Sequence, residues 1–554
     1  MKNISVIILA VILFSCKQNT NQNEIIPDEP EKPFVWQGAN IYFLLTDRFN
    51  NGDPSNDINF ERTRETAKLR GFEGGDLKGV TQKIKDGYFT DLGINAIWMT
   101  PIVEQIHGAT DEGTGLTYAY HGYWTKDWTA IDPNFGTSDD LQELVDEAHK
   151  RGIRIILDAV INHTGPVTDK DPVWPKQWVR TGNQCTYDNY ENTVRCTLVE
   201  NLPDIRTESD NDVDLPPQLV KKWKAEGRYD KEMAELDAFF DRTGYPRAPR
   251  FYIIKWLTDY IKEFGIDGYR ADTVKHTEAY VWQEFRKECD YAFEQFKINH
   301  PDKIIDDNDF FLVGEVYNYG ISTGQTFDFG DKKVNYFDPP SFQSLINFEF
   351  KWNAKNIDKP KLFHKYDSIL SQELKTFGTL NYLTSHDDGN PFDAKRENSF
   401  DAATLLLLSP GQSQIYYGDE TERPLEVENA VGDANLRSFM NWEDLKSTDS
   451  IQNTLEHYQR LGQFRQKHPS VGAGKHQLLS ENPLVFSRQL SLKDIDDKVV
   501  IGLDLESQEI EIDIKDFFGE VNNIYDYYSG QRLKVKDGKV KVTPHKGIIL
   551  LESE

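Results

Sequence analysis

Residues 137–163 read TSDDLQELVDEAHKRGIRIILDAVINH and predict a helix followed directly by a buried strand. Thr137 or Ser138 can cap the helix, and Gly152 is suited to end it. Apolar residues recur within it at helical spacing, at Leu141, Leu144, Val145 and Ala148. The β-rich run 153–157 follows and ends at Asp158. Such a unit is typical of a parallel sheet covered by helices.

The same alternation of short apolar runs and amphipathic stretches continues from about residue 40 to residue 460. Seven runs are predicted strands: 41–44, 96–99, 153–157, 268–270, 311–313, 379–383 and 414–417. An eighth strand is expected around residues 348–350. Eight such units fit an α/β fold of the (β/α)8 TIM barrel type better than an open sheet.

Two stretches do not follow this alternation of strands and helices. Residues 164–250 are polar and contain prolines and cysteines, which predicts a domain inserted after the third strand. After about residue 466 the pattern changes to alternating strands, with a hairpin turn at Asp537-Gly538, which predicts a separate antiparallel β domain. We therefore expect the barrel at 35–163 and 251–466, the insertion at 164–250 and the C-terminal domain at 467–554.

The N-terminus has the form of an export signal. Met1-Lys2 precede the apolar run 4–14, which is too short to span a membrane. Residues 13–16 resemble a bacterial lipobox, so that 1–16 would be a lipoprotein signal peptide and Cys16 the lipidated residue. An ordinary cleaved signal or a tethering helix is the alternative. Residues 17–34 are polar and predict a flexible tether. We expect an exported protein, lipid-anchored on the periplasmic or cell-surface side.

The net charge limits the classes of binding partner, and the cysteines indicate the cellular compartment. A net charge of -28 disfavours nucleic acid and anionic membrane surfaces, whereas an uncharged ligand such as a sugar meets no repulsion. Membrane contact is expected only through the anchor at Cys16. Cys185 and Cys196 predict a local disulfide in an exported chain, and Cys289 is expected to be a buried thiol.

Four polar clusters follow predicted strands, at 158–163, at 270–276, at Glu315 and at His386-Asp387. Taken singly, each has a structural interpretation, such as a turn, a cap or a solvated loop. Together they fall at the carboxyl ends of barrel strands, where active sites of such folds lie. Retaining glycoside hydrolysis needs two carboxyl groups about 5 to 5.5 Å apart, and these clusters offer candidates.

The segments DAVINH (158–163), GYRADTVKH (268–276), Gly314-Glu315 and SHD (385–387) resemble the signature regions of the α-amylase family of glycoside hydrolases, in order. A fifth region is present as LPD (202–204). The resemblance covers about residues 35–554 and implies a catalytic barrel, an inserted domain B and a C-terminal β-sandwich. It implies that Asp272 is the nucleophile, Glu315 the general acid/base and Asp387 a third carboxylate that grips the sugar.

Further roles are implied at the sugar-binding positions. Arg270 precedes Asp272 by two residues and should point to the same face of the strand, although a structural ion pair would look the same. The resemblance implies substrate contacts at His121, Tyr123, His163, Lys275, His276, His386, Asp433 and Arg437.

Calcium is the expected ion, because hard oxygen ligands cluster in residues 51–57 and 74–76. The first set resembles a site of cyclodextrin glucanotransferases and consists of Asn51, Asp53, Asn56, Asp57, Gly74 and Asp76. The alternative for this set is an Asn/Asp-rich turn without a metal. The resemblance implies a second set at Asn162, Asp204 and the backbone carbonyl of His276.

The leading functional hypothesis is hydrolysis of α-1,4-glucosidic bonds in starch, glycogen or maltodextrins. A glucanotransferase or cyclodextrin-acting enzyme is the second, disfavoured because the additional starch-binding modules typical of such enzymes are lacking. A lipid-anchored glucan-binding protein without activity is the third. The fourth signature region departs from the common pattern at Ser385 and at 388–390, which leaves product size open.

Overall fold

The computed structural model describes residues 33–337, 341–446 and 448–553. The predicted signal peptide, Cys16 and nearly all of the predicted tether therefore lie outside the described residues. Among those described, no helix combines the length and apolar character needed to span a bilayer.

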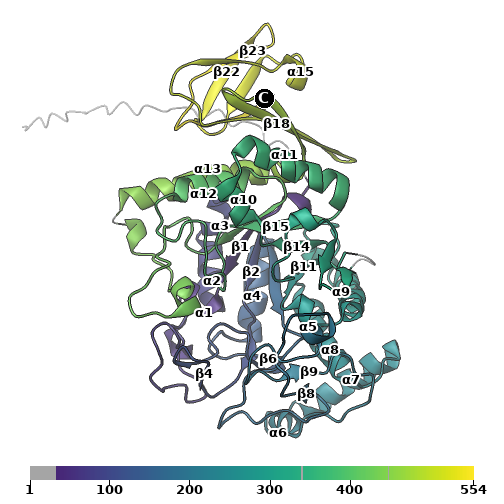
Figure 1. The fold of residues 1–554 in the computed structure, drawn as a ribbon. Coiled ribbons are helices and arrows are strands. Elements are labelled where there is room, and N and C mark those ends of the chain that lie inside the picture. The colour runs from purple at the N-terminus through teal and green to yellow at the C-terminus, as the bar shows by residue number, and fades with distance from the viewer. Residues whose placement is uncertain (1–32, 338–340, 447, 554) are drawn as a thin grey trace, which may run out of the picture.

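Eight parallel strands close into a barrel at the centre of the molecule (Figure 1). They are β1 (Asn40–Leu44), β2 (Ala96–Met99), β7 (Arg154–Ala159), β10 (Gly268–Ala271), β11 (Phe311–Gly314), β14 (Ser344–Asn347), β15 (Gly378–Tyr382) and β16 (Gln412–Tyr416). Every residue in these strands is buried, as expected for strands covered by helices outside and side chains inside. The predicted barrel is confirmed.

The expected eighth strand at 348–350 was wrong. The strand is β14, and Phe350 instead begins the helix α10 (Phe350–Asn356). Polar residues at both ends of β14 break the apolar pattern expected of a barrel strand. Each of them hydrogen-bonds to a polar side chain on another barrel strand. Ser344 Oγ donates to Gln412 at 2.6 Å, and Asn347 donates to Asn381 at 2.8 Å.

Helices pack around the barrel and begin and end with recognisable signals. They include α1 (Thr46–Phe49), α2 (Leu77–Lys85), α3 (Tyr88–Asp91), α4 (Ser138–His149), α8 (Pro249–Phe264), α9 (Ala279–Asn299), α11 (Lys359–Ile369), α12 (Ser399–Leu408), α13 (Asp449–Lys467) and α14 (Ser470–Ala473). Of the two predicted caps, Thr137 is the one that caps α4, and it does so in a reciprocal capping box with Asp140. Gly265 ends α8 in the left-handed conformation (φ 72°) and leads the chain into β10.

Two excursions extend from the barrel at the end opposite the C-terminal domain (Figure 1). The expected insertion after β7 contains β8 (Val179–Arg180), α5 (Glu191–Val194), β9 (Asp204–Ile205), α6 (Pro217–Ala225) and α7 (Tyr229–Thr243). The excursion after β2 was not anticipated and contains β3 (Val103–Gln105), β4 (Thr110–Asp111), β5 (Leu116–Thr117) and β6 (Thr125–Ile131). A short hairpin of β12 (Thr326–Asp328) and β13 (Lys333–Asn335) follows β11. The carboxyl ends of the barrel strands face this end of the molecule.

The C-terminal part forms one curled, eight-stranded antiparallel sheet with its own small apolar core. In spatial order its strands are β17 (Lys475–Ser480), β18 (Leu484–Leu492), β19 (Ile495–Leu503), β24 (Ile549–Ser553), β21 (Asn523–Asp526), β22 (Gln531–Lys536), β23 (Lys539–Val542) and β20 (Ile510–Asp513), with a short helix α15 (Lys515–Phe518). Asp537 and Gly538 both have positive φ and make the predicted turn between β22 and β23.

Both cysteine predictions are confirmed. Cys185 and Cys196 form a disulfide within the insertion, with their Cα atoms 4.9 Å apart. Cys289 is a free, fully buried thiol on α9.

Candidate active site

One guanidinium joins the ends of three neighbouring barrel strands. Arg270 in β10 is only 1% exposed and donates from Nη1 to Asp158, at the end of β7, at 3.0 and 3.1 Å. The same Nη1 lies 2.6 Å from Asp272 Oδ1, and Nη2 lies 3.1 Å from Glu315 Oε1. Three buried carboxyl groups therefore share one cation, and the structure brings Asp272 and Glu315 onto the same guanidinium.

The barrel backbone fixes these acids by extending its hydrogen bonds past the strand ends. The Asp272 N–H donates to Ala159 O at 3.0 Å, and the Glu315 N–H donates to Ala271 O at 2.9 Å. Thr273 follows in the left-handed region (φ 50°), which a β-branched residue rarely adopts. Its N–H donates to Glu315 Oε2 at 3.0 Å. Backbone strain of this kind is concentrated at functional sites.

Burial and the excess of negative charge change the proton affinity of the acids. Burial raises the pKa of Glu315 to about 8; Arg270 opposes this increase, whereas Asp272 and Asp387 add to it. Burial also raises the pKa of Asp158, against the effect of Arg270. At neutral pH Glu315 therefore holds a proton that it can donate, which is the property that a general acid requires.

A wall of neutral rings lies beside the acids. Tyr123 donates its hydroxyl to Asp158 at 2.9 Å and stacks on His386 with ring centroids 5.2 Å apart. His163 Nε2 lies 3.1 Å from the Tyr123 carbonyl, and His121 Nδ1 accepts from the Tyr123 N–H at 3.1 Å. Burial lowers the pKa of His121, of His163 and of His386, the last to about 4. Uncharged imidazoles of this kind can hydrogen-bond to sugar hydroxyls.

Asp387 and the predicted outer pair lie on the loops after β15 and β16. Asp387 is partly accessible to solvent and accepts a hydrogen bond from Ser385 at 3.1 Å. Desolvation of its carboxyl group acts to raise its pKa, but electrostatic interactions with His386, Arg270 and Arg437 outweigh this effect and lower the pKa. Arg437 donates to the His386 carbonyl at 2.8 Å and pairs with Asp433 at 2.8 Å.

Lys275 and His276 lie on the short turn that follows Asp272. Lys275 Nζ donates to the Tyr317 carbonyl at 3.2 Å, and burial lowers its pKa. His276 Nδ1 lies 2.8 Å from the Thr193 carbonyl of the insertion, and burial lowers its pKa to about 4. The turn thus connects the barrel to domain B.

Several residues of the site were not predicted. Trp98 donates to Asp158 at 3.2 Å, and Arg70 pairs with Asp433 at 2.7 Å. Asp388 is buried and bonds to Lys351 and, at 2.7 Å, to the Tyr382 hydroxyl. No local sequence pattern indicates which partner Trp98, Arg70 or Asp388 contacts. Asp388 alone had a signal, as an acid directly after Asp387.

The first predicted calcium set is only partly assembled. Asn51 donates to Asp57 at 2.9 Å, and a Cβ at Gly74 would lie within 2.7 Å of both side chains. The amide oxygens of Asn51 and Asn56 are buried without a hydrogen-bond partner.

The two remaining carboxylates of this set already have other partners. Asp76 caps α2 and accepts backbone N–H groups of Gly52, Asp53 and Gly79, while Asp53 pairs with Lys78 at 2.6 Å. Across the described ranges, no group of three or more His, Cys, Asp or Glu side chains has the geometry to hold a metal ion.

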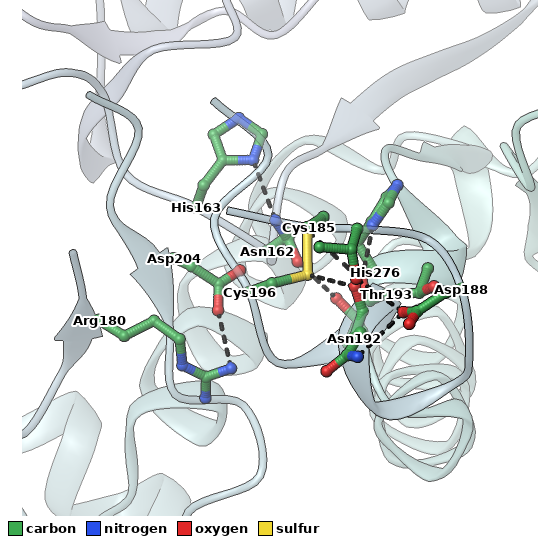
Figure 2. Close-up of a disulfide and its surroundings, with 12 residues drawn as sticks. Asn162, His163, Arg180, Cys185, Asp188, Asn192, Thr193, Cys196, Asp204 and His276 are labelled. Carbon is green, nitrogen blue, oxygen red and sulfur yellow. Dashed lines mark hydrogen bonds and ion pairs between the residues drawn. A yellow bond between two sulfur atoms is a disulfide. The ribbon is translucent and has the colours of Figure 1, made fainter. Parts of the chain in front are cut away.

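The second predicted set has a stronger requirement for a cation. Asp204 is 1% exposed, and neither carboxylate oxygen accepts a hydrogen bond of good geometry. Burial raises its pKa well above the usual range, although the Arg180 guanidinium lies 3.1 Å away and opposes that increase. Asn162 lies beside it (Figure 2). Arg180 and Asn162 do not offset the burial of this carboxylate, so a second cation beside it would stabilise its charged form.

Comparison with known proteins agrees with this geometry. The family model "Alpha amylase, catalytic domain" matches residues 43–469. The periplasmic alpha-amylase of Escherichia coli K12 is 35% identical over 526 residues, covering 85% of this chain and 72% of that protein. The cyclomaltodextrin glucanotransferase of Niallia circulans is 28% identical over 450 residues, covering 79% and 55%. The chain therefore spans little more than half the length of that glucanotransferase.

Solved structures share the fold. An alpha-amylase from Geobacillus thermoleovorans, complexed with acarbose, matches with a TM-score of 0.64 and 23% identity, over 94% of this chain and all of that one. A cyclomaltodextrin glucanotransferase with a three-domain ABC distribution matches with a TM-score of 0.64 and 21% identity, with the same coverage. From the family match and the 35% identity, the chain belongs to the alpha-amylase family and is a glycoside hydrolase or glucanotransferase.

Proposed function

We propose that the protein is a retaining hydrolase that cleaves α-1,4-glucosidic bonds in starch, glycogen or maltodextrins. The observation that supports this most directly is the sharing of Arg270 by Asp272 and Glu315. Arg270 Nη1 lies 2.6 Å from Asp272 Oδ1, whereas the pKa of Glu315 is raised to about 8 although Glu315 contacts the same guanidinium. A nucleophile and a general acid need this division of roles.

In the first step, an oxygen of Asp272 attacks the anomeric carbon while Glu315 transfers its proton to the glycosidic oxygen. The carbon–oxygen bond to the leaving chain breaks, and that chain departs as an alcohol. In the second step, the Glu315 carboxylate takes a proton from water, whose oxygen displaces Asp272. Two inversions at one carbon leave the configuration of the product unchanged.

The surrounding residues are proposed to hold the sugar. Asp387, His163 and His386 would bind hydroxyls of the reacting ring, Tyr123 would stack under it, and His121 would add a further contact. Asp433 and Arg437 would bind sugars further along the donor side. Lys275 and His276 would contact the leaving chain, because their turn follows Asp272 and Lys275 bonds to the carbonyl of Tyr317, two residues beyond Glu315.

We also propose calcium at the two sets of oxygen ligands. At the second site Asn162, Asp204 and the His276 carbonyl would hold the ion, which would add a second cation beside the Asp204 carboxylate and join domain B to the barrel. At the first site Asn51, Asn56, Asp57 and Gly74 fit the ion. Asp53 and Asp76 fit less well, because their oxygens are already engaged.

We also propose the domain limits and the cellular location. We assign 35–163 and 251–466 to the barrel, 164–250 to domain B and 467–554 to the C-terminal domain. The E. coli relative named as periplasmic supports export of this chain. Lipid attachment at Cys16 rests on the sequence alone.

Transfer of glucan chains is the second candidate function, because cyclomaltodextrin glucanotransferases are among the relatives. The number of domains does not separate the two candidates, since a cyclomaltodextrin glucanotransferase with a three-domain ABC distribution shares the fold. Hydrolysis is preferred because the relative named alpha-amylase is more similar, at 35% against 28% identity.

The test is an analysis of products formed from maltoheptaose by the purified protein. Hydrolysis predicts shorter linear glucans and a steady rise in reducing ends. Cyclic or elongated glucans without that rise would instead support transfer. Binding of soluble starch without any new product would overturn both and leave a glucan-binding protein.

A further inference from the structure

The disulfide Cys185–Cys196 closes a short segment of domain B that lies against the rim of the barrel (Figure 2). Within it, Asn192 donates to Asp188 Oδ1 at 2.9 Å, and the Cys185 N–H donates at 3.0 Å to the carbonyl of Thr197, the residue after Cys196. The segment 185–196 is mostly polar, and only Thr193, Val194 and Cys196 are buried. Apolar packing alone therefore contributes little to holding it, so that the covalent link is the main constraint.

This segment contacts the loop that follows β10. The Thr193 carbonyl lies 2.8 Å from His276 Nδ1, and Arg195 Nε lies 3.1 Å from Glu278 Oε1. A carbonyl oxygen can only accept a hydrogen bond, so Nδ1 of His276 must carry the proton that it donates to Thr193. The contact therefore fixes both the orientation and the tautomer of His276.

The same segment also contacts the hairpin that follows β11. The Tyr190 N–H donates to Asp331 Oδ1 at 2.8 Å, and the Tyr190 ring packs against Phe329 at 5.1 Å. Segment 185–196 thus bridges two loops that leave adjacent barrel strands, one carrying Asp272 and the other Glu315.

Both loops reach the leaving-group side of the proposed reaction. His276 and Lys275 lie directly after the Asp272 turn, and Lys275 bonds to the Tyr317 carbonyl, two residues beyond Glu315. The proton of Glu315 goes to the leaving chain, so groups on this side of Glu315 face that chain rather than the reacting ring.

We propose that the disulfide-closed segment 185–196 is a positioning element for the leaving-group side of the site. The enzyme then reaches full activity on glucan chains only after the disulfide has formed, in an oxidising compartment. This inference rests on the proposed function and adds to it a dependence of activity on the redox state of two cysteines outside the reacting groups.

The kinetic test compares a Cys185→Ser/Cys196→Ser variant with wild type on two substrates. Maltoheptaose has a leaving chain that occupies this side of the site, whereas the leaving group of α-glucosyl fluoride is a single ion. We expect kcat/KM for maltoheptaose to fall about tenfold, since small misplacements are costly, with an unchanged rate on the fluoride. Cys289→Ser, which alters the buried thiol on α9, is the matched control and should change neither rate.

Equal losses on both substrates would show a general structural defect and overturn the proposal, as would no loss on either. Should the double variant fail to fold, wild type reduced with a phosphine and alkylated under native conditions replaces it, with the same expected ratio of rates. A wild-type protein that cleaves neither substrate would reject the proposed function instead.

Hydrogen exchange tests the positioning without relying on activity. Breaking the disulfide should speed amide exchange in residues 273–278 and 329–333, and leave β18 and β19 of the C-terminal sheet unchanged. Unchanged exchange in both loops would overturn the proposal even if the protein proved to have another activity.

Discussion

Two clusters of buried charge lie at opposite ends of the barrel, and they are built differently. The rim cluster places the carboxyl groups of Asp158, Asp272 and Glu315 around Arg270 alone. The junction cluster lies where α13 meets the C-terminal sheet, and its members are Lys467, His468, Asp497 and Glu552. There His468 contacts both acids through its two ring nitrogens, and Lys467 also pairs with Glu552 at 2.7 Å.

Glu315 and Glu552 are buried to nearly the same degree, but their pKa values shift in opposite directions. Burial raises the pKa of Glu315 to about 8, and Arg270 does not offset burial together with the charges of Asp272 and Asp387. For Glu552, hydrogen bonds and charge from His468 and Lys467 outweigh burial and lower the pKa. Balanced charge therefore marks a contact that holds two parts of the chain together, and unbalanced charge marks groups poised to exchange a proton.

The largest expected effect follows from Asp272→Asn. The variant keeps the shape of the side chain but removes the nucleophilic oxygen, so kcat should fall by about 10⁴-fold or more. Thermal unfolding should occur at or above the wild-type temperature, because the rim cluster loses one excess negative charge. Near-normal turnover in an assay of reducing ends would contradict the assigned role.

Glu315→Gln should cost about 10³-fold on maltoheptaose, because the leaving chain then departs without a proton. The loss should be much smaller on α-glucosyl fluoride during the first step, since fluoride needs little protonation. Pre-steady-state release of fluoride measures that step. Equal losses on both substrates would mean that Glu315 does not act as the acid.

The junction cluster should respond in stability and not in rate. Glu552→Gln removes the buried carboxylate that His468 and Lys467 contact and should lower the free energy of unfolding by about 3 kcal/mol, measured in urea, with kcat/KM unchanged. Glu552 has a lowered pKa in the folded state, so its stabilisation is present above its unfolded pKa and is lost as pH falls through the folded value. A rate defect equal to that of Glu315→Gln would remove the distinction between the clusters.

The smallest effect concerns pH. Activity requires the protonated form of Glu315, whose pKa is raised to about 8. The rate should therefore hold through neutral pH and fall about tenfold per pH unit above that value. A profile of kcat/KM for maltoheptaose measures it. A fall that begins near pH 5 would show that Glu315 has an ordinary pKa.

Most of the barrel could be predicted because its strands are continuous apolar runs with helices between them. The exception, β14, is bounded by Ser344 and Asn347, whose partners on β15 and β16 are supplied only by the closed barrel. The excursion after β2 was missed because its strands are short and paired with irregular register. The turn at Asp537-Gly538 could be predicted, because it depends on local chemistry alone.

The candidate site likewise combines residues that short motifs single out with contacts that only the fold creates. Asp272, Glu315 and Asp387 stand in short motifs, so they could be singled out, and their roles remain predictions. The pairing of Arg270 with Asp158 joins residues 112 positions apart, and that of Arg70 with Asp433 joins residues 363 apart. No local pattern encodes such distances. The engagement of Asp53 by Lys78 also depends on where α2 is placed.

The most direct test of the double displacement is to trap its intermediate. Incubation with 5-fluoro-α-glucosyl fluoride slows the second step more than the first, and mass spectrometry of peptides then locates the attached sugar. We predict a single sugar ester on the peptide that contains Asp272. A sugar on Asp158, Glu315 or Asp387, or turnover of maltoheptaose with inverted products and no ester, would contradict the proposed mechanism.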